Sequence, residues 1–404
     1  MARTDATIRV SLTDAGKMLL LGTVLFFFAA AVIPAFGVLT ALLSVLITAL
    51  VVGFVLRPRV RVTETVPDSV VVGQSVQLHY ALENTARVPA YDLHLQFEKL
   101  PETIEQVGQT AIVPYLAPGE ASNVAVTVQP QRRGYYGLPS PICQSSFPFN
   151  LLCFGRSHRA EQALTVLPVF YQMQCPIRRL SRHVRTGGTG FAGRAEVSPE
   201  YAGNRPFLPG DSPRRIDTRA WARLSVPATK EYHNDSDSRA ALVLDTRVPA
   251  RLRPPGADEI PALEAAVSLT ASIAFSINGN CLVDLLLAGP QLHEYTSWLR
   301  GPRLHKIHEV LAGVQPAEDY ALDAATAALG GRLYDISEVI FILLNWDRTY
   351  TRLLEAAARA GCHSTVLLID APAQAPGETD EVDWADVVKT VSSDDILTGR
   401  IERL

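Results

Sequence analysis

The chain has 404 residues, of which 48% are hydrophobic and only 19% are charged. This composition excludes a disordered or fibrous protein, and so little charge suggests that some apolar sequence faces lipid. The net charge of -4 argues against a globally basic nucleic-acid binder, and five cysteines without a Cys-x-x-Cys pair exclude a disulfide scaffold or a cysteine-rich zinc site. At roughly 150 residues per domain, the length predicts two or three domains.

Residues 18–56 contain no charged side chain over 39 positions. One helix that crosses a bilayer needs roughly 20 apolar residues, so this run is close to two helices. It predicts a transmembrane hairpin of Met18–Ile33 and Val38–Leu56, with a turn near Pro34 and Gly37. A cleaved signal peptide is the alternative, although its apolar core normally has only about 7–15 residues.

Basic residues flank the hairpin on both sides: Arg3, Arg9 and Lys17 before it, and Arg57, Arg59 and Arg61 after it. Positively charged flanks remain in the cytoplasm, and a hairpin keeps both of its ends on one side. We therefore expect a two-pass protein of the cell inner membrane, in contact with the lipid bilayer. Residues 1–17 would form a cytoplasmic N-terminus, and the large soluble part would also be cytoplasmic.

Residues 60–170 alternate between apolar and polar side chains over short runs. Examples are Tyr91–Glu98 and Asn123–Val128, with turn sequences such as Gly73-Gln74 and Pro118-Gly119 between the runs. A period of two residues indicates half-buried strands. Short strands separated by regular turns predict an all-β, immunoglobulin-like sandwich, whose expected role is to space and orient the parts that follow.

An arginine-rich linker is predicted over residues 171–236. Between Arg178 and Arg223 there are ten arginines, four acids and no lysine. Arginine favours bidentate pairing with carboxylates or phosphates. Three interpretations remain open: an internal Arg–Asp network, a docking surface for an acidic partner segment, and nucleic-acid binding, which the lack of a stacking aromatic series disfavours. Locally, we expect Asp211 to cap a short helix over residues 214–223.

This linker resembles the signature of the "domain of unknown function 58" family, roughly R-x-Y-x-P-G-D-x-x-R-x-I-D-W-x-x-x-A-R. The matching positions are Arg205, Phe207, Pro209, Gly210, Asp211, Arg214, Ile216, Asp217, Thr218, Ala222 and Arg223. Phe207 stands where the family has Tyr and Thr218 where it has Trp, which marks a divergent member. We expect a partner-binding or structural network of Arg205, Asp211, Arg214, Asp217 and Arg223.

The resemblance implies several further properties. Proteins of this family are similar in arrangement to ones encoded beside MoxR-type AAA ATPases and transglutaminase-like membrane proteins. Their last domain resembles the von Willebrand factor A fold, and no catalytic reaction is established for them. Such ATPase partnerships suggest assembly or activation of other complexes.

Residues 237–404 predict a doubly wound α/β domain, because apolar strands alternate with helices. The strands are expected over residues 240–244, 281–287, 339–344 and 365–369, and the helices over residues 261–278, 304–313, 319–329 and 352–360. The tail from residue 370 to residue 404 has nine acids against three bases and is expected to be a solvated face, with a small prospect of contacting the arginine-rich linker.

Asp245 and Asp347 follow two of these strands, and ligands bind at the carboxyl ends of strands in such sheets. The resembling fold continues its first strand into Asp-x-Ser-x-Ser, which binds a divalent cation. Here Arg247 and Pro249 occupy the two serine positions. A guanidinium repels a cation and proline offers no side-chain oxygen ligand, so the metal site is expected to be lost.

The sequence therefore predicts a non-enzymatic, membrane-anchored adaptor or scaffold that needs no cofactor and does not bind nucleic acid. Its expected partners are a MoxR-type AAA ATPase and other membrane proteins. The alternative is a divalent-cation-dependent ligand-binding protein that uses Asp245 and Asp347. An enzymatic function has little support, because no nucleophile–base pair or pair of catalytic acids is visible.

Overall fold

The computed structural model divides the chain into two compact units, residues 1–169 with 308–314 and residues 170–307 with 315–404. It describes residues 7–29, 36–108, 110–157, 161–175, 200–207, 216–233, 239–254, 256, 259–277, 281–288, 292–296, 303–317, 333, 336–346, 349–370 and 387–401.

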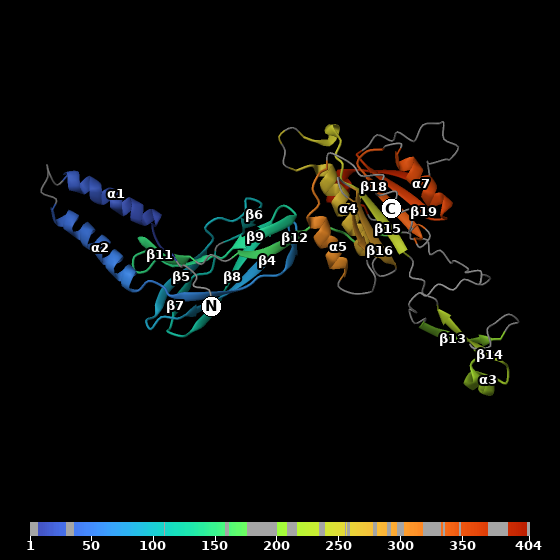
Figure 1. Cartoon of the computed structure of the whole chain (residues 1–404). Coiled ribbons are helices and arrows are strands. Elements are labelled where there is room, and N and C mark those ends of the chain that lie inside the picture. The colour runs from blue at the N-terminus through green and yellow to red at the C-terminus, as the bar shows by residue number, and fades with distance from the viewer. Residues whose placement is uncertain are drawn as a thin grey trace. The chain divides into compact units, whose positions relative to one another are not determined.

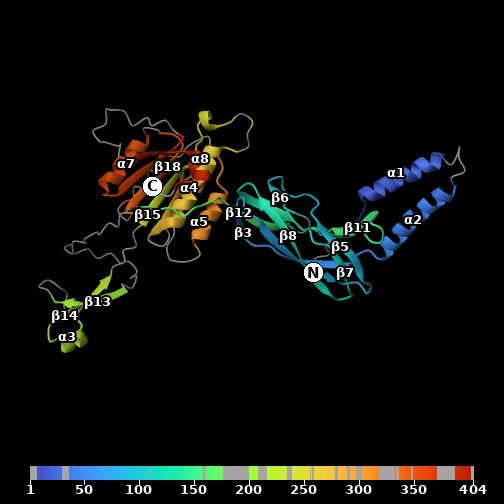
Figure 2. The ribbon, with the colours of Figure 1, turned by 180° about the vertical axis from the view of Figure 1, so that it is seen from behind.

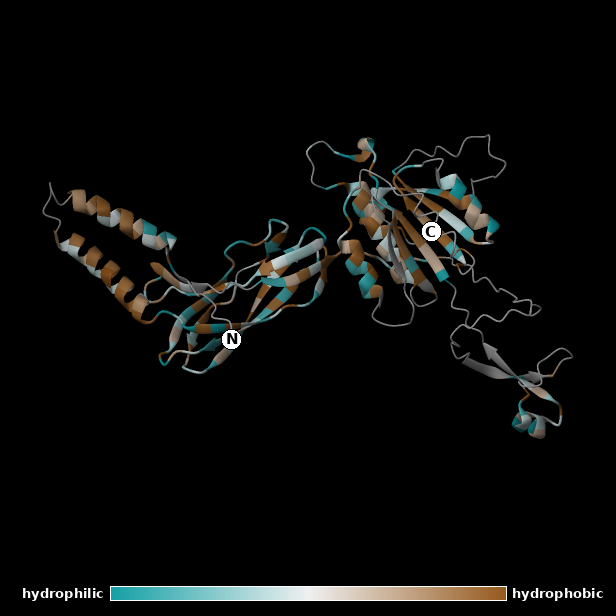
Figure 3. Ribbon diagram, viewed as in Figure 1, coloured by the Kyte–Doolittle hydropathy of each residue, from teal (hydrophilic) through white to brown (hydrophobic). Residues whose placement is uncertain are grey.

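Two apolar helices, α1 (Asp14–Ala29) and α2 (Phe36–Val55), lie side by side in the first unit (Figures 1 and 2). Hydrophobic residues dominate α2 and most of α1, whereas the first turn of α1 is hydrophilic (Figure 3). Among the residues that the structure describes, α2 is the helix that is long and apolar enough to cross a membrane. Gly37 lies in the first turn of α2 and not in the predicted turn, whereas Pro34 falls outside the described residues.

A β-sandwich forms the rest of the first unit. Its strands are β1 (Thr7–Leu12), β2 (Val60–Thr65), β3 (Ser69–Val71), β4 (Val76–Asn84), β5 (Ala90–Gln96), β6 (Ile104–Gln106), β7 (Val113–Leu116), β8 (Ala121–Pro130), β9 (Gly134–Pro139), β10 (Ile142–Ser145), β11 (Leu152–Ser157) and β12 (Glu161–Leu167). They form sheets in the orders β2-β4-β8-β6, β1-β11-β10-β5-β7 and β3-β12-β9. All of these pairings are antiparallel except the one between β3 and β12.

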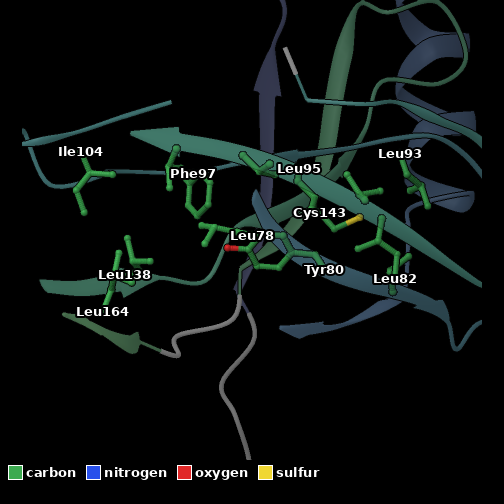
Figure 4. Packing of buried hydrophobic residues seen from close by; sticks show 14 of the residues in the cluster. Leu78, Tyr80, Leu82, Leu93, Leu95, Phe97, Ile104, Leu138, Cys143 and Leu164 are labelled. Atoms are coloured by element: carbon green, nitrogen blue, oxygen red, sulfur yellow. The ribbon is translucent and has the colours of Figure 1, made fainter. Parts of the chain in front are cut away.

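The predicted alternation produces the core of this sandwich, because every second side chain of a strand points to the same face. Leu78, Tyr80 and Leu82 of β4 are buried against Leu93 and Leu95 of β5 (Figure 4). Figure 4 also shows Leu138 and Leu164, from β9 and β12, in the same cluster. The apolar faces of the sheets therefore close over a single core.

The N-terminal segment forms a strand that was not predicted, although Ile8, Val10 and Leu12 alternate there with polar residues. β1 pairs with β11 from Thr7↔Ser157 to Leu12↔Leu152 and leads directly into α1. Arg9 on this strand forms an ion pair with Glu98. A strand therefore continues the chain into α1, and its backbone hydrogen bonds to β11 join the start of this helix to the sandwich.

The second unit begins with a small antiparallel element. β13 (Glu200–Pro206) and β14 (Ala228–His233) pair with each other, and α3 (Thr218–Leu224) lies between them in the chain. A bulge interrupts their register between Tyr201 and Gly203.

A six-stranded sheet forms the α/β part in the order β17-β16-β15-β18-β19-β20. Its elements are β15 (Arg239–Asp245), η2 (Ala250–Leu252), α4 (Pro261–Ile277), β16 (Leu282–Ala288), β17 (Leu292–Thr296), α5 (Arg303–Ala312), β18 (Glu338–Leu343), α7 (Thr349–Arg359), β19 (His363–Ile369), β20 (Val388–Val391) and α8 (Ser393–Leu397). All neighbouring strands are parallel except β17, which runs antiparallel to β16.

Helices cover both faces of this sheet. Ala241 and Val243 of β15 belong to a buried cluster with Tyr350 and Leu353 of α7. The intervening residues of β15 are equally buried and point to the opposite face, where α4 packs against β15, β18 and β19. The predicted doubly wound sheet is present, and its strands are buried on both sides as expected for parallel sheets.

The acidic tail is not only the solvated face that its charge suggested. β20 adds a parallel strand to β19, and α8 packs against α4 with Ile396 buried. In α8 the acids Asp394 and Asp395 lie on the side away from the buried Ile396, so the charge of the segment did not indicate a packed helix. The predicted helix over residues 319–329 lies outside the described residues.

Candidate functional site

Strand β15 ends on a fully buried carboxylate, Asp245. Its Oδ1 accepts a hydrogen bond from the backbone N–H of Arg247 at 2.8 Å, and its Oδ2 accepts one from the hydroxyl of Tyr350 at 2.9 Å. A buried carboxylate is costly unless donors satisfy it. Here groups from this chain occupy both oxygens.

Tyr350 was not anticipated by sequence reasoning. It belongs to α7 and is fully buried, with its ring 6.4 Å from that of Phe341 and 6.4 Å from that of Trp346, measured between centroids. Only the folded sheet brings it to Asp245, which lies 105 positions earlier in the chain. No local spacing signal could have paired these two residues.

Three arginines lie in the segment that follows Asp245, and we call Arg247, Arg251 and Arg253 the arginine edge. The guanidinium of Arg251 donates to the backbone oxygens of Leu344 at 3.0 Å and Asp370 at 3.4 Å. These two residues follow β18 and β19, so Arg251 ties together the carboxyl ends of two strands.

Arg253 also donates hydrogen bonds to the backbone, one of them within the same segment. Its Nε donates to the backbone oxygen of Val248 at 3.2 Å, and its Nη2 donates to that of Ala317 at 3.4 Å. Ala317 also forms a parallel bridge with Arg247. The sequence pointed to Arg247 alone, although the spacing of the other two arginines after Pro249 was visible.

This arrangement bears on the predicted loss of a metal site. A cation that approached Asp245 would compete with the Tyr350 hydroxyl and would meet the positive charges of the arginine edge. Within the described residues, no group of three or more His, Cys, Asp or Glu side chains is placed to hold a metal ion. Asp347, the other candidate ligand, lies outside those residues.

Only part of the arginine-rich signature lies within the described residues. The backbone of Arg205 is in β13, opposite Thr229 of β14. Asp211 and Arg214 lie outside the described part of the chain, whereas Asp217 and Arg223 lie within it.

Asp217 caps helix α3. Its Oδ1 accepts from the backbone N–H groups of Arg219 at 3.0 Å and Ala220 at 3.1 Å, and its Oδ2 accepts from Asn204 Nδ2 at 3.3 Å. The predicted helix over residues 214–223 is therefore wrong at its start: the helix begins at Thr218, and its cap is Asp217 rather than Asp211. An aspartate at this position satisfies backbone donors that have no partner within the helix.

The surface of α3 is divided into two faces. Ala220 is buried, whereas Arg219, Trp221, Ala222 and Arg223 are exposed, with 43% of Trp221 accessible. At about 100° per residue, Arg219, Trp221, Ala222 and Arg223 span roughly 200° of the helix surface and leave Ala220 outside that arc. We call these four residues the α3 face.

Four of the five cysteines have a raised thiol pKa. Burial raises the pKa of Cys143 to about 12, and burial together with the nearby Glu338 carboxylate raises the pKa of Cys175 and of Cys281 to about 12. Burial also raises the pKa of Cys153. A thiol is nucleophilic as the thiolate, so these four groups are held in their unreactive form near neutral pH.

Comparison with known proteins gives little guidance. No family model matches the chain, and no curated protein matches it. Solved structures that match in part include the CARDB domain of a Pyrococcus furiosus protein (12% identity, 27% of this chain and 97% of that chain, TM-score 0.16). Two others are the secreted serine protease VesC from Vibrio cholerae (12% identity, 31% and 26% covered, TM-score 0.19) and a GH20 exo-β-N-acetylglucosaminidase from Vibrio harveyi (9% identity, 78% and 57% covered, TM-score 0.16). Scores this low establish neither a common overall fold nor a common function.

Proposed function

We propose that this chain is a membrane-anchored, non-enzymatic adaptor related to the "domain of unknown function 58" family. The two-helix hairpin holds it in the cell inner membrane with the soluble part in the cytoplasm. The immunoglobulin-like sandwich acts as a spacer, and the von Willebrand factor A-like domain and the signature bind a protein partner. A MoxR-type AAA ATPase is the partner that the family resemblance favours.

Membrane anchoring is supported by the length and composition of the helices. α2 has 20 residues and no charged side chain. At 1.5 Å per residue it is about 30 Å long, which matches the hydrocarbon core of a bilayer. α1 lies against it and carries charge only at its beginning, at Asp14 and Lys17.

The arginine edge supports binding in preference to metal chemistry. Ligands of doubly wound sheets bind at the carboxyl ends of the strands. Here that position carries Asp245 with both oxygens bound, next to the exposed Arg251 and Arg253. Such a surface suits an acidic segment of another protein better than a cation.

The observation that carries the proposal is the α3 face. Trp221 and two arginines are exposed on a short helix whose first turn is fixed by Asp217. Tryptophan and arginine are the residues that most often dominate the energy of protein–protein interfaces.

The test measures binding of the full chain, reconstituted in lipid nanodiscs, to a purified MoxR-type ATPase from the same genome. Trp221→Ala and Arg223→Ala should each weaken binding by roughly tenfold, which corresponds to about 1.4 kcal/mol.

Arg359→Ala is the matched control, because Arg359 is an exposed arginine at the end of α7. Its binding should equal that of the wild type. Equal binding by Trp221→Ala, Arg223→Ala and the wild type, all correctly folded, would remove the α3 face from the interface. Turnover of a small substrate by the purified chain would reject the non-enzymatic assignment.

A further inference from the structure

Aromatic side chains gather at one end of the β-sandwich. Tyr115 is 52% exposed and Phe149 is 51% exposed. Behind them the ring of Tyr91 stacks on Phe147 at 4.7 Å between centroids and meets Tyr115 edge-on at 5.6 Å. We call these four residues the aromatic collar. They come from β5, from β7 and from the turn between β10 and β11.

The turn that carries Phe149 is fastened to the beginning of α1. Thr13 donates from its hydroxyl to the backbone oxygen of Asn150 at 2.6 Å and from its N–H to that of Leu151 at 3.1 Å. A Cβ atom at Gly16 would lie 2.0 Å from the Leu151 oxygen, so helix and turn are in direct backbone contact. Phe149 is therefore next to the point where the first apolar helix starts.

The end of α2 meets the same end of the sandwich. Gly53 lies so close to the ring of Phe154 that a Cβ atom would approach it to 2.1 Å. After the helix, the backbone oxygen of Arg59 accepts from both the N–H and the hydroxyl of Thr85, at 2.9 and 2.7 Å. The last turn of α2 and the connection that follows it are thus both attached to the domain.

Tyr115 is linked to this attachment point through the sheet. Asn84 pairs with Val60, the first residue of β2 after the hairpin. Its Nδ2 also donates to the backbone oxygen of Leu116 at 3.0 Å. Tyr115 precedes Leu116 on β7, so both exposed rings of the collar lie at the end of the domain that holds the hairpin.

We propose that the aromatic collar sits in the interfacial layer of the bilayer, so that the sandwich rests on the membrane instead of being suspended above it. This inference depends on the membrane anchoring proposed above. The contact between Gly53 and Phe154 puts the domain within one helical turn, 5.4 Å, of the end of the apolar segment. Aromatic rings favour this depth because they combine an apolar body with a polarised edge or a hydroxyl.

The charges nearby are compatible with this position. The guanidinium of Arg57 lies 4.8 Å from the centre of the Phe54 ring, at the end of α2. Asp14 has Lys17 as an ion-pair partner, with 2.8 Å between them. Cationic side chains at the two helix boundaries suit the phosphate level of a lipid headgroup layer.

Depth-dependent fluorescence quenching of the full chain in phosphatidylcholine vesicles tests the inference. Trp is introduced by Phe149→Trp or, separately, by Tyr115→Trp, and lipids are brominated either near the glycerol end or near the tail end of the acyl chain. The signal of the four native tryptophans, measured on the wild type, is subtracted. Both new tryptophans should lose intensity with the shallow bromines and shift to shorter wavelength.

Two further variants make the outcome decisive. Val107→Trp places a probe on an exposed residue next to β6, whose partner positions on β8 lie at the opposite end of the sandwich, and it should not be quenched. Leu43→Trp places a probe on the exposed surface of α2 and should be quenched by the deep bromines.

If Leu43→Trp is quenched while both collar probes behave like Val107→Trp, the collar is not in the membrane and this inference is overturned, although the anchoring stands. If Leu43→Trp is itself not quenched in a folded chain, the anchoring fails. A shift to shorter wavelength of the collar probes without quenching would mean contact with a second copy of the chain, and would also reject the lipid contact.

Discussion

At the scale of single residues, the pairing of Asp245 with Tyr350 is the feature with the clearest energetic consequence. Both groups are completely buried, and the Tyr350 hydroxyl is the donor for one carboxylate oxygen. Removing one partner of a buried hydrogen bond leaves the other unsatisfied, which costs more than the bond itself contributes. The bond therefore fixes the end of β15.

Tyr350→Phe should consequently lower the free energy of unfolding of the α/β part by about 1–3 kcal/mol. Urea unfolding followed by circular dichroism measures the change. Tyr115→Phe is the control, because the exposed position of Tyr115 should keep the change within about 0.5 kcal/mol. An equally stable Tyr350→Phe variant would show that the bond contributes nothing to the fold.

A second prediction at this scale concerns divalent cations. Because both oxygens of Asp245 have donors from the chain, millimolar Mg²⁺ or Mn²⁺ should not raise the melting temperature of the full chain relative to a sample with chelator. A rise that disappears in Asp245→Asn would instead identify a cation site and favour the cation-dependent alternative.

At the scale of elements, the start of α3 depends on one side chain. Asp217→Ala removes the acceptor for two backbone N–H groups and should destabilise the β13–α3–β14 element by about 1 kcal/mol. Asp217→Asn keeps an acceptor oxygen and should retain most of the stability. Hydrogen exchange of the Arg219 and Ala220 amides measures the effect at the site. Unchanged protection in Asp217→Ala would contradict the assigned cap.

The contact between α2 and the sandwich can also be tested at the scale of elements. Gly53→Ala places a methyl group 2.1 Å from the Phe154 ring, so the helix or the ring must move. It should lower the melting temperature of the full chain in detergent. Gly37→Ala adds the same methyl group to the same helix where nothing lies within 4 Å, and it should be neutral. The double variant Gly53→Ala, Phe154→Leu replaces the ring with a smaller side chain and should recover part of the lost melting temperature. Equal melting of the two glycine variants would exclude the close contact.

At the scale of the whole molecule, buried and partly buried thiols make the stability depend on alkaline pH. The pKa of Cys143, Cys175 and Cys281 is raised from an ordinary value of 9.0 to about 12. As the pH rises, the unfolded chain therefore loses these thiol protons at a lower pH than the folded chain does. Stability from these groups is complete below pH 9 and is lost as the pH rises from about 9 toward 12.

The melting temperature should accordingly fall over that pH range, and less so in a variant with Cys143→Ala and Cys281→Ser. Ellman's reagent provides an independent readout, because the thiols should react slowly in the native chain at pH 8 and rapidly in urea. Fast reaction of all thiols in the native chain would contradict their burial.

Local pattern was sufficient for much of the architecture. The absence of charge over residues 18–56 indicated apolar helices, alternation indicated the sandwich strands, and continuous apolar runs such as Ala240–Leu244 indicated parallel strands. These features were predictable because burial sets the spacing of apolar residues along the chain. The spacing is two residues in a half-buried strand and 3.6 in an amphipathic helix, and a fully buried strand is a continuous apolar run. Strands β17 and β20 were missed because they are short, whereas β1 was missed although Ile8, Val10 and Leu12 alternate with polar residues.

The sequence by itself determined which segments are apolar, where the arginines concentrate, and that the two serine positions after Asp245 are altered. Only the tertiary structure decided that Tyr350 donates to Asp245, that Asp217 caps a helix while Trp221 stays exposed, and that aromatic rings gather at the end of the sandwich that contacts α1 and α2. The reason is physical. Periodicity is a property of neighbours along the chain, whereas a hydrogen bond between residues 245 and 350 exists only after the sheet has brought them within 3 Å of each other.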